Sequence, residues 1–205
     1  MLAADGCVGL TPVPGDHLAT VVTALEMVER PRPRPLPASP FRLVRWEKPD
    51  SERYRALFRR VGSPWLWYSR LAMDEERLRA ILDDPLIEVY AAVDRAGIEI
   101  GMVELDFRTE ATCGLVYFGL VPELTAQGHG AWLMGHMLAL AWRRDVRRLT
   151  VHTCTLDHPN ALPFYRRHGF VPTKRTLETF PDPRLLGLLP PETAPQIPCL
   201  AGNAR

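Results

Sequence analysis

The sequence predicts a mixed α/β (α+β) fold, with a largely antiparallel sheet and helices on both of its faces. Three strand-like segments follow one another between residues 87 and 121, which is the pattern of an antiparallel meander. A long helical segment and another strand come next, and such a crossover is right-handed and places its helix over the sheet. The chain has 205 residues, of which 46% are hydrophobic, so it can bury a sizeable core.

Local signals predict the elements in order. They are a strand at 17–27, a strand at 41–46, helices at 52–61 and 75–82, strands at 87–93, 98–107 and 112–121, a helix at 127–144, a strand at 149–153, a helix at 159–167 and a strand at 171–180. The β-branched residues at 20–23 favour a strand for the first segment, although an amphipathic helix also fits. Ser51 and Asp74 are expected to cap the first two helices, and Gly169 to end the last one.

Breaks and periodicity set the remaining boundaries. Gly62-Ser63-Pro64 ends the first helix, and Asp83-Asp84-Pro85 ends the second. Asp94-Arg95-Ala96-Gly97 is the turn between the first two strands of the meander. The long helix is predicted from apolar residues at helical spacing, namely Leu133, Met134, Met137, Leu138 and Ala141.

Prolines cluster near both ends, at 31–40 and 181–198. Because proline fixes φ and lacks an N–H, both stretches are expected to be extended and polyproline-like. Each end is either disordered or an arm laid over the domain, and the apolar residues of the second stretch favour an arm. The expected organisation is an N-terminal extension with a strand and a Pro-rich linker at 1–40, a globular domain at 41–180 and a Pro-rich arm at 181–205.

Composition excludes several classes of protein. The formal net charge of +1 leaves no electrostatic footprint for nucleic acid or for an anionic membrane. No apolar run approaches the roughly 20 residues of a membrane span, and residues 1–10 lack the pattern of a secretory signal. The four cysteines form no Cys-x-x-Cys pair, which argues against a disulfide framework or a zinc knuckle. We therefore expect a soluble, cytoplasmic protein.

The turn between the third meander strand and the long helix is the first candidate for chemistry. Gly128 and Gly130 open the helix directly after a strand and a short loop. Glycines let the backbone approach a bulky anion, and the free N–H groups of the first turn form a diphosphate cradle. The alternative interpretation is a tight turn in which the same glycines serve packing alone. A P-loop is excluded because Gly-Lys-Ser/Thr is absent, and a Rossmann site lacks its third glycine.

A second motif lies on the last predicted helix, in the segment from 157 to 170. With it, the sequence resembles the GNAT superfamily of N-acetyltransferases over residues 41 to 180. The segment 127–131 matches the first five places of the family's Gln/Arg-x-x-Gly-x-Gly/Ala motif, and Tyr165, Gly169 and Phe170 match Tyr-x-x-x-Gly-Phe. Two places depart from the family pattern: Trp132 stands at the sixth place of the first motif, and His158 replaces the usual asparagine, with Asn160 two residues later.

The resemblance implies an acetyl-CoA-dependent N-acetyltransferase that transfers acetyl directly to a primary amine. It also implies a splay between the third meander strand and the strand after the long helix, where the pantetheine arm lies. A backbone N–H near Leu120 would face the thioester oxygen. The residues that it assigns to the cofactor are Gly119, Leu120, Val121, Gln127, Gly128, His129, Gly130, Ala131, Trp132, His158, Asn160 and Phe164.

Two proton transfers need residues. Tyr165 matches the family's acid, although a packing tyrosine fits the same helix. Many relatives carry a glutamate early on the third meander strand, where this chain has Cys113 and Gly114. The remaining candidates for the base are Glu104, His152 and, beyond the strands, Glu123. Glu104 could instead belong to a solvated strand face, and His152 could be a hydrogen-bonded core histidine. Water relays could replace either residue as the base.

The region between the first two helices sets acceptor choice in the family. Here it carries Trp65, Trp67, Tyr68 and Arg70, which suit an apolar or cationic acceptor, or else a lid over the core. The acceptor is a small-molecule or peptide amine that the sequence does not identify, and homodimer formation is left open. No metal is expected, because His152, Cys154 and His158 lack a matching ligand. The alternative function is a non-catalytic acyl-CoA-binding sensor or interaction module.

Overall fold

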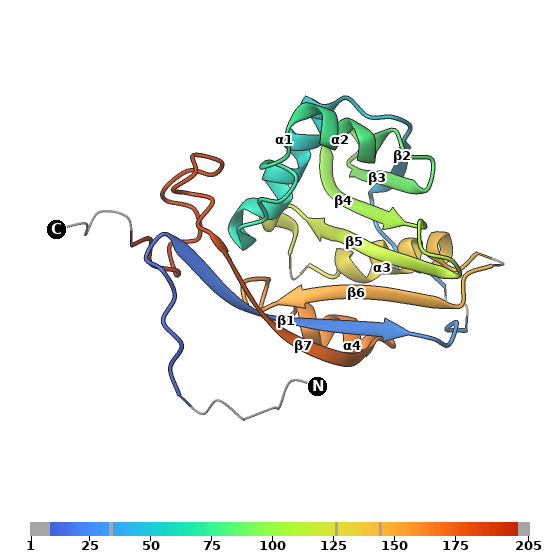
Figure 1. Cartoon of the computed structure of the whole chain (residues 1–205). Helices are drawn as coiled ribbons and strands as arrows, with labels where there is room; N and C mark the ends of the chain where they lie inside the picture. The colour runs from blue at the N-terminus through green and yellow to red at the C-terminus, as the bar shows by residue number, and fades with distance from the viewer. Residues whose placement is uncertain (1–8, 33–34, 126, 144, 201–205) are drawn as a thin grey trace.

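The computed structural model describes residues 9–32, 35–125, 127–143 and 145–200, and a seven-stranded sheet runs through it in the order β2-β3-β4-β5-β6-β1-β7 (Figure 1). The strands are β1 (His17–Met27), β2 (Arg42–Trp46), β3 (Ile87–Val93), β4 (Glu99–Asp106), β5 (Thr112–Leu120), β6 (Arg148–Cys154) and β7 (Val171–Pro181). The helices are α1 (Ser51–Gly62), α2 (Glu75–Leu82), α3 (His129–Ala141) and α4 (Ala161–Arg167), with 3-10 turns η1 (Ser63–Trp65) and η2 (Pro122–Leu124). The predicted mixed α/β fold is confirmed.

Helix starts differ from the prediction at three places, and one of them is α4, which begins at Ala161 rather than at 159. Asp50, not Ser51, caps α1, because its side chain accepts a hydrogen bond from the Arg53 N–H at 3.0 Å. The α3 helix starts at His129 rather than at 127, because Gly128 before it has a φ of +85°. The predicted helix end at 144 and the proline at 33 lie outside the described residues.

The first strand is built into the sheet. β1 pairs antiparallel with both β6 and β7, and so fills the place between the last two strands of the chain (Figure 1). This settles the choice between strand and helix for residues 17–27 in favour of a strand. Leu25, near the end of β1, is fully buried, so the N-terminal strand contributes to the core as well as to the backbone ladder.

A bulge in β5 opens the middle of the sheet. Glu104 of β4 lies opposite Tyr117, whereas the next residue, Leu105, lies opposite Leu115, so Val116 is an extra residue. Such a bulge bends its strand and increases the local twist. The parallel pairing of β5 with β6 ends at the same point, because Leu115 is the last residue of β5 in register with β6. Beyond the bulge the two strands diverge.

Helices cover both faces of the sheet, as predicted. Successive side chains of a strand point to opposite faces. Tyr117 packs edge-on against Phe58 of α1, with 4.8 Å between ring centroids. Its neighbour Phe118 packs against Phe164 and Tyr165 of α4, at 5.8 and 6.3 Å. The α1 helix therefore lies on one face of β5 and the α4 helix on the other.

The C-terminal segment forms a turn-rich arm rather than the extended segment predicted for it. Arg184 and Asp182 form a buried ion pair with an N–O distance of 2.6 Å. The Arg184 guanidinium also donates to the carbonyl oxygens of Thr193 and Ile197, at 3.1 and 2.8 Å. These bonds draw the backbone into turns around one side chain. Leu189 is buried in the core cluster, so this part of the segment packs against the rest of the domain.

Within the described ranges, no helix combines the length and the apolar character needed to cross a bilayer.

The place of β1 in the core can be tested with two substitutions on the same strand. Leu25→Ala should lower the free energy of unfolding by about 2–5 kcal/mol, because it leaves a cavity at a fully buried position. Val21→Ala, at a side chain that is 39% exposed, should cost about 1 kcal/mol or less. Urea denaturation measures both values. Equal, small effects would mean that residues 17–27 are a dispensable extension.

Candidate functional site

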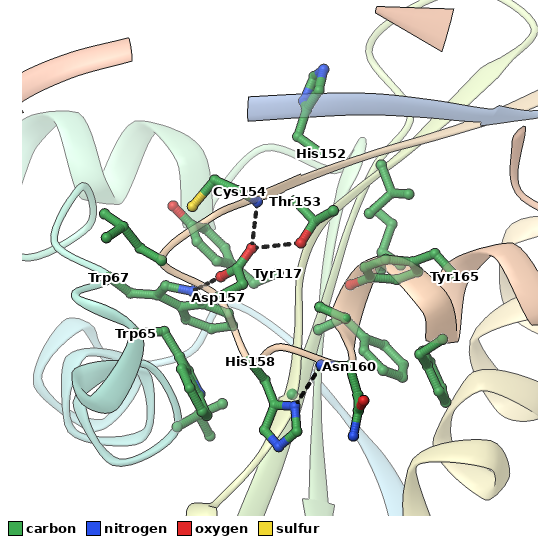
Figure 2. Close-up of a pocket in the computed structure, with 18 of the residues that line it drawn as sticks. Trp65, Trp67, Tyr117, His152, Thr153, Cys154, Asp157, His158, Asn160 and Tyr165 are labelled. Atoms are coloured by element: carbon green, nitrogen blue, oxygen red, sulfur yellow. Dashed lines mark hydrogen bonds between the residues drawn. The ribbon is translucent and has the colours of Figure 1, made fainter. Parts of the chain in front are cut away.

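A pocket of about 680 Å³ opens where β5 and β6 diverge (Figure 2). It passes through the sheet, because residues on both faces line it. The lining segments are 115–120 of β5, 151–154 of β6, 65–69 after α1, the first turn of α3, much of α4, and residues of β1 and β7. The bulge at Val116 is therefore the feature that creates the pocket, and the segments around it supply its walls.

The start of α3 lies at one end of the pocket. Gly128, Gly130 and Ala131 line it. Gly128 has a φ of +85°, which a side chain rarely tolerates, and no side chain caps the helix. The first N–H groups of α3 thus have no side-chain acceptor among the described residues, and the helix dipole adds partial positive charge there. The predicted diphosphate cradle therefore faces the pocket.

Four of the residues assigned to the cofactor lie outside the pocket lining: Val121, Gln127, His129 and Trp132. The Gln127 amide donates to the Glu123 carbonyl at 2.7 Å, and the His129 ring packs on Phe41 at 4.6 Å. Trp132 is buried and turns into the core, 6.2 Å from the Phe41 ring. The structure corrects the assignment of these side chains and shows why a large ring at 132 leaves the cradle clear.

The other assigned residues line the pocket. Gly119 packs against α1, since an added Cβ would lie 2.7 Å from Val61 Cγ1. His158 accepts a hydrogen bond at Nδ1 from the Asn160 N–H at 3.1 Å, and its ring packs edge-on against Trp65. Leu120 and Phe164 complete the set. These residues come from both sides of the gap between β5 and β6.

Tyr165 projects from α4 into the pocket and is only 7% exposed. Figure 2 shows its hydroxyl directed toward the pocket interior. That hydroxyl has no hydrogen-bond partner among the described residues. Burial raises the pKa of Tyr165 well above its ordinary value, and the negative charge of Asp157 raises it further. The phenol therefore holds its proton at neutral pH and can donate it to a group in the pocket.

Glu104 and Arg70 are placed differently from the prediction. Glu104 is fully buried and is not part of the pocket lining. One carboxylate oxygen accepts from Arg70 at 2.5 Å, and the other accepts from the Tyr54 hydroxyl. Strand alternation gave the correct face for Glu104, but α1 covers that face, so it is not solvated. The pair is a buried structural contact, which contradicts a direct role of Glu104 as base or of Arg70 in acceptor binding.

His152 lines the edge of the pocket and is exposed. Figure 2 shows its ring pointing away from both Asp157 and Tyr165. It makes no side-chain hydrogen bond to the described residues, so it is not the bonded core histidine that one interpretation expected. Among the residues that the structure describes, no three histidine, cysteine, aspartate or glutamate side chains lie together as a metal site would require.

Three of the predicted acceptor residues form an aromatic wall. Trp65, Trp67 and Tyr68 line the pocket, and Trp67 packs against Tyr117 with 5.1 Å between ring centroids. Tyr68 stacks on Phe180 of β7, with 4.8 Å between ring centroids and an interplanar angle of 13°. The wall therefore joins the segment after α1 to the end of the last strand.

Asp157, in the loop between β6 and α4, is a site residue that sequence reasoning missed. One carboxylate oxygen accepts from the Trp67 indole N–H at 3.2 Å. The other accepts from the Thr153 hydroxyl at 2.8 Å and from the Cys154 N–H at 2.9 Å (Figure 2). Glu178 of β7 also lines the pocket. A carboxylate directly after a strand and before the second motif was the available signal for Asp157; Glu178 becomes apparent only once β7 is placed.

Comparisons with known proteins agree with this geometry. The family model described as acetyltransferase (GNAT) family matches residues 40–170. A search of curated proteins gave no significant match.

Solved structures share the fold at low sequence identity. A conserved protein of unknown function from Staphylococcus epidermidis has a TM-score of 0.57 at 14% identity, over 81% of this chain and 63% of that one. A GCN5-related N-acetyltransferase from Sphaerobacter thermophilus has a TM-score of 0.55 at 18% identity, over 80% of this chain and 52% of that one. An aminoglycoside acetyltransferase from an uncultured soil metagenomic sample, in complex with sisomicin, has a TM-score of 0.52 at 16% identity. The match covers 62% of this chain and 86% of that one. The chain spans less than two thirds of the first two structures.

The structural role of Glu104 can be tested against a second glutamate of β4. Glu104→Ala should lower the free energy of unfolding by about 3–5 kcal/mol, because Arg70 would stay buried without its partner. Glu99→Ala, which removes a more exposed pair with Arg53, should cost about 1 kcal/mol or less. Denaturant unfolding separates the two. A stable Glu104→Ala protein with lost activity would instead support the role of base.

Proposed function

The chain belongs to the GNAT family of acetyltransferases, and on that basis we propose that it transfers an acetyl group from acetyl-CoA directly to a primary amine. One observation carries the proposal. The pocket crosses the sheet at the gap between β5 and β6, with a helix N-terminus at one end and an aromatic wall at the other. A long cofactor and a separate acceptor can thus approach one another from opposite faces.

The residues present fit acetyl-CoA. The glycine turn at 128–130 leaves room for a diphosphate, because a Cβ at Gly130 would come no closer than 3.5 Å to Phe164 and neither glycine carries a side chain. Beyond Leu115, no strand among the described residues pairs with the edge of β5 that faces β6, so this edge can bond an extended chain. When bound, acetyl-CoA supplies the activated acyl group.

Two proton transfers accompany the reaction. Transfer forms an N–C bond and breaks the C–S bond, so the amine loses a proton and the departing sulfur gains one. Tyr165 is the proposed donor to the sulfur, since its hydroxyl faces the pocket and keeps its proton. With Glu104 enclosed, removal of the amine proton falls to water in the open pocket or to His152 at its edge.

The donor can be tested by thiol release and calorimetry with acetyl-CoA. Gly130→Glu should weaken acetyl-CoA binding at least about 100-fold, because a carboxylate would face the diphosphate at the helix start. Gly15→Glu is the matched control, since Gly15 lies outside the pocket and has open space around it. Equal affinity in both variants would place the cofactor elsewhere.

The amine panel for the same assay contains alkylamines, amino acids, peptides and an aminoglycoside. Tight acetyl-CoA binding with no thiol release on any of these amines would favour the alternative function, a non-catalytic acyl-CoA-binding module.

Tyr165→Phe tests the proposed acid. The variant should lower kcat about 10²–10⁴-fold with little change in the KM for acetyl-CoA, because only the proton donor is lost. Stability should be nearly unchanged, since the hydroxyl makes no hydrogen bond to the described residues. Because the pKa of Tyr165 is raised, its ionisation should add no loss of activity between about pH 6 and 9. Full kcat in the variant would remove Tyr165 from this role.

A further inference from the structure

The two ends of the pocket differ in charge. On the face of β5 that α4 covers, the α3 N-terminus contributes partial positive charge. Arg167 of α4 is the one arginine or lysine among the described residues that line the pocket. Two carboxylates, Asp157 and Glu178, also line it. The contacts of Asp157 and Glu178 place both side chains on the opposite face, with the aromatic wall.

Asp157 is fixed in place by neutral donors. Its oxygens accept from the Trp67 indole, the Thr153 hydroxyl and the Cys154 N–H. Trp67 packs against Tyr117, and the Tyr117 ring projects to the face that α1 covers. Asp157 therefore lies beside the aromatic wall. No lysine, arginine or histidine within the described ranges forms an ion pair with it.

Glu178 lies at the same end of the pocket. It is two residues before Phe180 on β7, so the two side chains share a face, and Phe180 stacks on Tyr68. Glu178 pairs across the strands with Thr20 of β1, and the Thr20 hydroxyl bonds that of Thr155 at 2.9 Å. Thr155 starts the loop that carries Asp157. The described part of the chain gives Glu178 no ion-pair partner either.

A third group at this site lacks a partner. The Tyr165 side chain is more than nine-tenths buried, yet its hydroxyl points into the pocket and bonds no described residue. The negative charge of Asp157 reaches this side chain, since it contributes after burial to the raised pKa of Tyr165. Because this hydroxyl opens into the pocket, a ligand bound there can complete its hydrogen bonding.

One carboxylate can serve as the base for the reacting nitrogen, but a pair of carboxylates exceeds what a single proton transfer needs. Two carboxylates that line one pocket without an ion-pair partner among the described residues are better matched by a second, non-reacting cation. The aromatic rings beside them add cation–π attraction for such a group.

On the basis of the proposed acetyl transfer, we propose that the acceptor is a diamine-type molecule whose second ammonium group binds between Asp157 and Glu178. The reacting amine then lies on the Tyr165 side of that group. Asp157 and Glu178 are specificity-determining residues in this account, whereas Tyr165 handles the proton.

The test compares acceptors of matched length. Thiol release is measured with 1,4-diaminobutane, 4-aminobutan-1-ol and butylamine at saturating acetyl-CoA. The diamine should have a kcat/KM at least about tenfold above the other two, the effect of one hydrogen-bonded charge. Glu178→Gln should remove most of that preference and leave the KM for acetyl-CoA unchanged. Glu110→Gln, an equal charge change at an exposed turn outside the pocket, should keep it.

Glu178→Gln is the decisive variant, because Glu178 accepts no hydrogen bond from the described residues and its loss does not threaten folding. Asp157→Asn should act in the same direction. Equal kcat/KM values for diamine and monoamines in the native protein would overturn this inference while leaving acetyl transfer intact.

If no amine is turned over, binding of 1,4-diaminobutane to the CoA-saturated protein is measured by calorimetry. Binding that Glu178→Gln abolishes would support the carboxylate site even though the proposed transfer fails. Absence of binding, or binding unchanged in Glu178→Gln, would overturn it.

Discussion

One extra residue in β5 determines most of what this protein can do. The bulge at Val116 ends the pairing of β5 with β6 at Leu115, and the two parallel strands separate from there on. Parallel strands at the centre of a sheet normally satisfy one another's backbone groups. Here one edge of β5 stays free inside the molecule, next to a helix N-terminus and a buried tyrosine. The pocket, the candidate cofactor path and the approach of the acceptor all follow from that separation.

Buried polar contacts hold the surroundings of the gap in place. Glu104 and Arg70 tie the segment that carries the aromatic wall to β4. Asp157 ties Trp67 of the same segment to the loop after β6, on the other side of the gap. The two carboxylates have different roles because their surroundings differ. Glu104 neutralises a buried guanidinium, whereas Asp157 is held by neutral donors and keeps its charge available to the pocket.

Much of the fold could be predicted from the sequence, because periodicity and helix-ending residues act locally. Each predicted helix and strand is present, and the turn at Gly128 was identified from its glycines. The position of β1 between β6 and β7 was not predicted, since strand order depends on contacts far apart in the chain. The same limit explains the Pro-rich arm, whose turns depend on the single side chain of Arg184.

The candidate site was only partly predictable for a related reason. Alternation along β4 placed Glu104 on a face correctly but could not show that α1 covers that face. A motif position identified Trp132 as a neighbour of the cradle but not the direction in which its ring turns. Asp157 and Glu178 are separated in sequence and meet the same aromatic wall only after β1 and β7 have paired.

The central claim, that the cofactor binds in the gap that the bulge opens, can be tested by amide hydrogen exchange with and without acetyl-CoA. Protection should increase within residues 116–120 of β5, which lie beyond the last residue paired with β6, and within residues 128–131 at the start of α3, where no described side chain caps the helix. It should stay unchanged in β2 at the far edge of the sheet. Saturable binding of acetyl-CoA without added protection in those two segments would contradict the account.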